Sequence, residues 1–134
     1  MQNNINQFNE VAATIFAYLH DHFPKPVGMK MHELVGGEIN SDEMSMCPKT
    51  DFAKDVVNWL TDEGYIKSSG GNFALYSQCV LTSKGLDALN STPDSLGGKA
   101  TTISKIKDGL ATGSSEVIKA AIGATVKSIV SHAL

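Results

Sequence analysis

Four side chains in the first half of the chain carry the nitrogen and sulfur atoms that bind metal ions or act as nucleophiles. They are His20, His22, His32 and Cys47. Structural zinc is usually held by four such ligands that converge on one point. His20 and His22 lie two positions apart in a predicted helix, where side chains at that spacing point away from each other. The pattern therefore favours histidines at a helix C-terminus, where the helix dipole stabilises their positive form, over a metal site.

Catalytic motifs are not found in the sequence. The glycine pairs at residues 36–37, 70–71 and 97–98 are typical of turns and linkers and not of a phosphate-binding loop. Neither a paired-histidine zinc helix nor a nucleophile elbow occurs, and Cys47 has no base close to it in sequence. We therefore expect a protein that is not an enzyme and that uses no cofactor, no metal and no catalytic residue.

The polar side chains that could contact DNA lie in one predicted helix and in the hairpin that follows it. They are Lys49, Thr50, Lys54, Asn58, Lys67 and Asn72. Lysines of this kind would contact phosphates, which supply most of the affinity for a duplex. Asp51 and Asp55 share the first turns of the same helix and would repel phosphates. The position of these charges on the folded surface therefore discriminates between DNA binding and other functions.

A helix and a β-hairpin are predicted in the middle of the chain. Apolar residues recur at helical spacing from Phe52 to Leu60, and Gly64 ends this helix. Two strands are predicted next, a short one over residues 65–67 and an alternating one over residues 73–81. The order is therefore helix, strand, turn, strand.

The turn of this hairpin is predicted over residues 68–72, which are serine, glycine and asparagine. After the hairpin, the Thr82 hydroxyl can cap a closing helix whose buried face includes Leu89. We expect Cys79 to be buried in the second strand. Both Cys79 and Cys47 are expected to be free, because two cysteines in a chain of this size form no disulfide framework.

Two helices are predicted before the helix that ends at Gly64. Apolar residues over 5–23 follow helical spacing, and two prolines end this first helix. Residues 30–35 are long enough for a second helix, which a glycine pair ends. The polar and acidic stretch 38–48 predicts an extended loop, longer than the tight turn of a compact helix-turn-helix.

Segments 59–66 (WLTDEGYI) and 81–89 (LTSKGLDAL) resemble those of many bacterial winged-helix proteins. There, a leucine, an acidic pair, a glycine, an aromatic residue and an isoleucine end the recognition helix, and a leucine, threonine, x, lysine, glycine step opens the next helix. The resemblance implies a winged helix-turn-helix domain over residues 1–90, mainly α with a small β-hairpin (α+β). With its helical tail the chain is also similar to a group of uncharacterised bacterial proteins, so the resemblance implies a fold and no activity.

The composition changes after Leu89. Residues 91–98 predict a linker, and residues 99–134 form a tail without aromatic residues. Two helices are predicted there, one around Ile106 and a longer one from Ser115, with Gly113 between them. The longer helix has an apolar face, which we call the tail stripe and which consists of Val117, Ile118, Ala121, Ile122, Val126, Ile129 and Val130.

The tail stripe must be buried, and the sequence leaves three partners open. It could pack on the domain of its own chain, pair with a second copy, or lie in a membrane interface. Small residues such as Gly123 allow close helix approach and favour self-association, so we expect a homo-oligomer. A membrane is less favoured because the helix has few lysines and no aromatic anchor.

Charge and composition favour a protein partner. Residues 1–90 contain six lysines and eleven acidic residues, a net charge of −5, whereas the rest carries five lysines and three acidic residues, a net charge of +2. The chain contains no arginine, which makes the commonest bidentate contact to guanine. The acidic loop and its methionines could contact a basic partner, although methionines also simply fill gaps. Lys99, Lys105 and Lys107 could instead form the only basic patch available for binding a nucleic acid.

We therefore expect a regulatory or interaction module that works through protein contacts. The alternatives are a DNA-binding winged-helix transcriptional regulator and an acidic immunity- or antitoxin-like inhibitor of a basic partner. A content of 42% hydrophobic and 19% charged residues is ordinary for one soluble domain. No apolar leader follows a basic start, and no run approaches the roughly 20 apolar residues that span a bilayer, so we expect a cytoplasmic protein.

Overall fold

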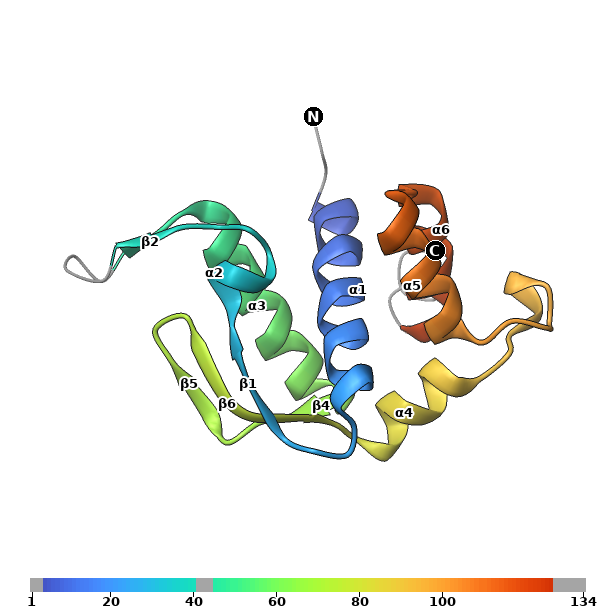
Figure 1. Ribbon diagram of the computed structural model, residues 1–134, viewed down its shortest axis with the longest axis horizontal. Coiled ribbons are helices and arrows are strands. Elements are labelled where there is room, and N and C mark those ends of the chain that lie inside the picture. Colours follow the sequence, from blue (N-terminus) through green and yellow to red (C-terminus); the bar gives the residue numbers. More distant parts are fainter. Residues whose placement is uncertain (1–3, 41–44, 127–134) are drawn as a thin grey trace.

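A central helix, α1 (Asn4–His22), separates a small antiparallel sheet and its helices from a pair of helices on the other side (Figure 1). The computed structural model describes residues 4–40 and 45–126. Most of the described elements are helical, and the strands are short and antiparallel. The class is therefore α+β, mainly helical with a small sheet, as the sequence predicts.

α1 is covered from more than one side. Its bounds agree with the helix predicted over residues 5–23. Ala12 and Ala13 are adjacent and both fully buried, as are the larger Ile15 and Phe16. Val11 and Ala13, which point about 160° apart around the helix axis, are both buried, so layers on two sides are needed to cover them. The sheet side and the helical pair together enclose α1.

A strand that the sequence analysis did not predict follows α1. β1 (Val27–Lys30) pairs with a strand some fifty residues later, with Met29 opposite Tyr76 and Lys30 opposite Leu75. The second helix, α2 (Met31–Leu34), is therefore only four residues long, and the prediction of a helix over residues 30–35 was wrong at its start. Lys30 joins the strand because its backbone pairs with a distant partner, which local spacing does not reveal.

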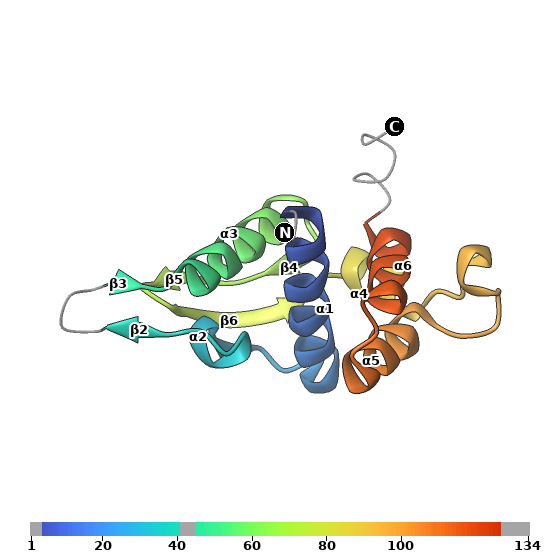
Figure 2. The ribbon, with the colours of Figure 1, turned by 90° about the horizontal axis from the view of Figure 1, so that it is seen from above.

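The segment predicted as an extended loop forms a small hairpin. β2 (Ile39–Asn40) pairs with β3 (Ser45–Met46), and Figure 2 shows this hairpin projecting at one end of the molecule. The next helix, α3 (Pro48–Asp62), begins with a proline at its first position, where a missing N–H costs nothing. It buries Ala53, Val56, Val57 and Leu60.

The hairpin after α3 has its turn later than predicted. β4 (Ile66–Lys67) and β5 (Gly70–Asn72) both pair with the long β6 (Leu75–Leu81). The predicted turn over residues 68–72 is wrong because most of it pairs with β6. Chain reversal occurs instead at Phe73, whose φ is 56°. A Cβ on Gly71 would lie 2.8 Å from the Tyr76 ring, so a glycine is needed there for packing.

The closing helix, α4 (Ser83–Asn90), begins as predicted. The Thr82 side chain accepts a hydrogen bond from the Gly85 N–H at 3.1 Å. A Cβ on Gly85 would lie 2.1 Å from the carbonyl oxygen of Tyr65, so glycine permits a close approach of α4 to the end of α3. Lys84 Nζ donates to the Glu63 carbonyl at 2.8 Å and lies 4.4 Å from the centre of the Tyr65 ring. The lysine-glycine step of this segment therefore has a packing role.

The tail folds as two capped helices after a short 3₁₀ helix, η1 (Asp94–Leu96). These helices are α5 (Thr102–Thr112) and α6 (Ser115–Thr125), with Gly113 between them at φ +71°, as the sequence predicts. Both pack on α1, and their buried side chains belong to the same hydrophobic core as those of α1 and α3. Within the described ranges, none of the helices combines the length and the apolar character needed to cross a bilayer.

Candidate interaction surface

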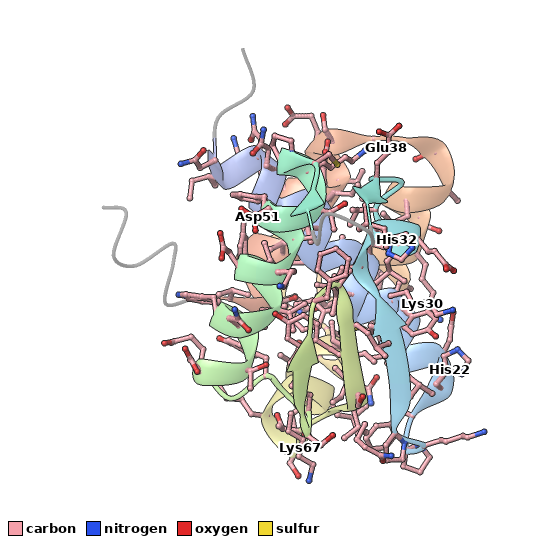
Figure 3. The ribbon with its side chains drawn as sticks, turned by 90° about the vertical axis from the view of Figure 1, so that its left-hand side faces the viewer. His22, Lys30, His32, Glu38, Asp51 and Lys67 are labelled. Atoms are coloured by element: carbon pink, nitrogen blue, oxygen red, sulfur yellow. The ribbon has the colours of Figure 1, made fainter. Side chains whose placement is uncertain are left out.

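The outward side of α3 carries three aspartates. Asp51, Asp55 and Asp62 are exposed, and together with the exposed Asn58 they follow steps of four, three and four residues. Side chains at this spacing lie along one face of a helix. We call these four residues the acidic stripe. Figure 3 shows Asp51 on the side of α3 that faces away from the strands.

The lysines that would support DNA binding do not gather on one face. Lys49 is exposed at the start of α3, but Lys54 is half-buried. Lys67 lies on β4, and Figure 3 shows it well separated from Asp51. Lys84 lies on α4, where it contacts the end of α3. The central part of the exposed face of α3 is therefore acidic.

Thr50 does not belong to a DNA-contact surface, contrary to the prediction. Its exposed fraction is 0%. Its Oγ1 donates to the Glu38 carbonyl at 3.3 Å and lies 3.4 Å from Cys47 Sγ. A Cβ on Gly37 would lie 2.0 Å from this Oγ1, so the hydroxyl is closely covered. Thr50 therefore ties the start of α3 to the segment before β2.

The two asparagines proposed as DNA contacts differ in what the structure describes. Asn58 is exposed, and its Oδ1 accepts a hydrogen bond from the Tyr76 hydroxyl at 3.0 Å. Asn72 lies in β5, and its side chain is outside the described part of the structure. Among the six predicted contacts, the side chains that the structure places on the exposed surface are therefore those of Lys49, Asn58 and Lys67.

A polar hollow of about 480 Å³ lies between the second half of α3 and the hairpin. It is lined by Asn58, Thr61, Asp62, Ser68, Ser69, Gly70, Gly71 and Tyr76. Burial raises the pKa of the Tyr76 hydroxyl above its usual value of 10.0, and this hydroxyl donates a hydrogen bond to Asn58 Oδ1 at 3.0 Å. With the Asp62 carboxylate and the hydroxyl groups around it, this hairpin hollow offers acceptors for a basic side chain.

Cys47 has a more reactive environment than its sequence neighbours indicated. Its sulfur lies at the N-terminus of α3, half-buried, and accepts the Glu38 N–H at 3.2 Å. The Thr50 hydroxyl, followed by the Glu38 N–H, lowers the pKa of the Cys47 thiol to about 7. The signal in the sequence was a cysteine directly before a proline, a pattern that fits a helix start, where thiolates are stabilised.

The histidines lie apart from Cys47. His20 and His22 occupy the last turn of α1, as predicted, and His20 Nε2 lies 3.1 Å from Asn90 Oδ1. His32 is in α2, with its Nε2 3.7 Å from a carboxylate oxygen of Glu33. In the described ranges, no group of three or more histidine, cysteine, aspartate or glutamate side chains could hold a metal ion.

The tail stripe is buried within its own chain in the part that the structure describes. Ile118, Ala121, Ile122 and Val126 are each at most 5% exposed and belong to the common core, and Val117 is half-buried. These side chains therefore do not form the predicted self-association surface, because α1 offers a second apolar side that covers them. Ile129 and Val130 lie outside the described residues.

The small residues of the tail also serve packing inside the chain. A Cβ on Gly109 would lie 2.7 Å from Ile118 Cγ1, so α5 and α6 approach closely at this point. Lys107 forms an ion pair with Asp21 of α1, and the pKa of the Asp21 carboxyl is lowered by this lysine. Lys107 is therefore already paired, whereas Lys99 is exposed and Lys105 is half-buried.

A comparison of the chain with protein-family models, with curated proteins and with solved structures found no match. The features that bear on function are those of the surface itself. They are the acidic stripe, the hairpin hollow beside it and the thiol at the start of α3.

Proposed function

We propose that the chain is a bacterial winged-helix protein, not an enzyme, that binds a basic protein partner through the acidic stripe of α3. The observation that carries this proposal is the run of exposed Asp51, Asp55 and Asp62 on one face of α3. Complementary charge steers association and sets specificity between proteins. A partner with lysine or arginine side chains facing α3 fits this surface.

Element order supports the winged-helix assignment. α1, β1, α2 and α3 are followed by a hairpin whose long strand, β6, also pairs with β1. This is the order of three helices and a wing that the resemblance implies. In winged-helix regulators the third helix enters the major groove of DNA. α3 occupies that place in the chain, so its exposed side is the natural contact surface.

The charge of α3 favours a protein partner over DNA. Three carboxylates on the contact face would have to approach phosphates, and their repulsion would add to that of a domain with a net charge of −5. The DNA-binding regulator is therefore the weaker proposal. An immunity- or antitoxin-like inhibitor is a special case of the stronger one, because such a protein covers a basic surface of its target.

The proposal is tested with a variant that removes the charge of the stripe and keeps its shape. Asp51→Asn, Asp55→Asn and Asp62→Asn are combined, and the control combines Asp87→Asn, Asp94→Asn and Asp108→Asn, which are exposed elsewhere. Each protein is titrated, by nuclear magnetic resonance, with a lysine- and arginine-rich peptide and separately with random duplex DNA. We expect the peptide to shift α3 resonances in the parent and the control, and far less in the stripe variant. Binding of DNA to the parent at moderate salt, or equal peptide binding by all three proteins, would contradict the proposal.

A further inference from the structure

The hairpin hollow has two walls that come from different elements. α3 supplies Asn58, Thr61 and Asp62, and the start of the hairpin supplies residues 68–71. Tyr76 of β6, which is only 6% exposed, completes the lining. In Figure 3, α3 and the strands of this hairpin lie side by side. Two of the lining residues are glycines, so a volume of about 480 Å³ stays open to a long side chain.

Three hydroxyl groups of the lining donate their proton to oxygen atoms of the protein. Thr61 donates to the Val57 carbonyl at 2.8 Å, Ser69 to the Ser77 carbonyl at 3.3 Å, and Tyr76 to Asn58 Oδ1 at 3.0 Å. A hydroxyl group has one proton to donate, but its oxygen can still accept through its lone pairs. Toward a bound molecule, these three groups therefore act as acceptors.

Backbone N–H groups at the start of the hairpin are also used inside the protein. The Ser69 N–H donates to the Ser77 carbonyl at 2.9 Å, and the Gly70 N–H donates to Ser68 Oγ at 3.2 Å. A bound carboxylate or phosphate needs such donors, and in this hollow it would also meet the Asp62 carboxylate. The hollow is therefore unsuited to an anion.

A donor-only cation fits the same lining. Asp62 is exposed and is the one charged side chain among the described lining residues. A guanidinium group has five N–H donors in a fixed plane and no acceptor, and it binds a carboxylate through two parallel hydrogen bonds. Its remaining N–H groups can reach hydroxyl oxygens on the opposite wall, whereas a lysine ammonium is a compact point charge. The lining therefore favours arginine over lysine.

We propose that one arginine side chain of the basic partner enters the hairpin hollow. Its guanidinium group pairs with the Asp62 carboxylate, and its other N–H groups donate to the hydroxyl oxygens of Thr61 and Ser69. This inference rests on the proposed function, because it names the partner residue that binds beside the acidic stripe. An arginine held in a pocket is a common anchor of a protein interface.

The full chain, labelled with ¹⁵N, is titrated with N-acetyl-arginine amide. The lysine compound has the same charge, and the citrulline compound has nearly the same shape as the arginine compound but no charge. We expect the arginine compound to shift the backbone resonances of Thr61, Ser69 and Gly70, the lysine compound to bind several-fold more weakly, and the citrulline compound to cause no shift. The absence of these shifts with the arginine compound, or equal shifts with the citrulline compound, would overturn the inference.

Variants then locate the binding. Asp62→Asn should weaken binding of the arginine compound by roughly tenfold, because a charge-assisted pair is lost. Glu63→Gln is the matched control: it removes the exposed neighbouring carboxylate, which does not line the hollow, and should change the affinity by less than about twofold. Equal affinity in Asp62→Asn and the parent would overturn the inference.

The lysine- and arginine-rich peptide separates this inference from the proposed function. If that peptide shifts the resonances of Asp51 and Asp55 but not those of Ser69 and Gly70, partner binding by α3 stands and the arginine site is overturned. If the peptide does not bind at all, the proposed function itself fails.

Discussion

α3 and α6 both bury an apolar face on α1, but they differ in what they present to solvent. The exposed face of α3 carries Asp51, Asp55 and Asp62 with an asparagine among them. The exposed face of α6 is mixed, with Glu116, Lys119 and an alanine. Packing explains the inner face of both helices, whereas packing alone does not require three like charges along one outer face. The comparison therefore indicates packing as the role of α6, and it supports the proposal that α3 binds a partner.

The largest effect is expected from a cavity on the tail side. Ile122 is 1% exposed, and Ile122→Ala should lower the free energy of unfolding by about 2–5 kcal/mol. Leu60→Ala on α3 is the matched change on the other side of α1 and should fall in the same range, because both residues belong to one core. Urea unfolding is followed by circular dichroism and by Trp59 fluorescence, and the two transitions should coincide.

The two effects would differ if the tail unfolded independently of the domain. In that case Ile122→Ala would shift part of the dichroism transition and leave the Trp59 transition where it is in the parent. Such a result would show that residues 99–126 unfold as a unit of their own.

The next effect concerns the glycine that lets α4 approach the end of α3. Gly85→Ala places a Cβ against the Tyr65 carbonyl and should cost about 1–3 kcal/mol of stability. Ser83→Ala changes an exposed residue in the first turn of the same helix and should stay within about 0.5 kcal/mol of the parent. Thermal unfolding of the two variants measures the difference. If the Gly85→Ala and Ser83→Ala variants were equally stable, α4 could move away from Tyr65 without a loss of stability.

A third test compares the N-termini of α3 and α6. Ser114 caps α6 with a hydroxyl, whereas α3 begins at a thiol whose pKa is about 7. At pH 7, Cys47 should therefore be a thiolate in about half of the molecules, and iodoacetamide should alkylate it quickly. Thr50→Val removes the hydroxyl that contributes most to this shift, so the pKa should rise and the rate at pH 7 should fall several-fold.

Cys79 provides an internal control for that measurement. Burial raises the pKa of its thiol to about 11, so it should stay unlabelled in the folded protein. Cys47→Ser should remove the fast labelling altogether. A rate at pH 7 that Thr50→Val leaves unchanged would show that the hydroxyl does not stabilise the thiolate.

The smallest effect is expected from the exposed ion pair that joins the tail to α1. Lys107→Ala should lower stability by less than about 1 kcal/mol, because solvent screens an exposed pair. Lys107 lowers the pKa of Asp21 below its usual 3.8, so the contribution is present at neutral pH and lost as the pH falls through the lowered value. The effect of Lys107→Ala on the free energy of unfolding is measured from pH 7 down to about pH 2. An effect that does not diminish toward the acid end would contradict the assignment.

Local signals in the sequence predicted several elements correctly. Helical spacing gave the bounds of α1, the Thr82 hydroxyl caps α4, and Gly113 separates the two tail helices. Each of these depends on residues close to one another in the chain. The sequence also predicted a buried Cys79, because it lies in an alternating strand.

The misplaced elements depend on distant pairing. β1 exists because it pairs with β6, and the hairpin turn moves to Phe73 because Gly70 and Gly71 pair with the same strand. The apolar face of α6 showed that this helix must be buried, but only the arrangement of α1 shows against what. Part of the acidic stripe was visible in the sequence as Asp51 and Asp55, whereas the hairpin hollow and the shifted pKa of Cys47 arise from tertiary contacts.

The central claim is that α3 contacts a protein, and cross-linking inside the cell tests it most directly. A photo-reactive amino acid is placed at Asp55 on α3 or at Ala120, which is exposed on α6. We predict a discrete protein adduct from position 55, lost when Asp51 and Asp62 are also changed to asparagine, and none from position 120. Adducts with nucleic acid at position 55, or the same protein adducts from both positions, would contradict the account.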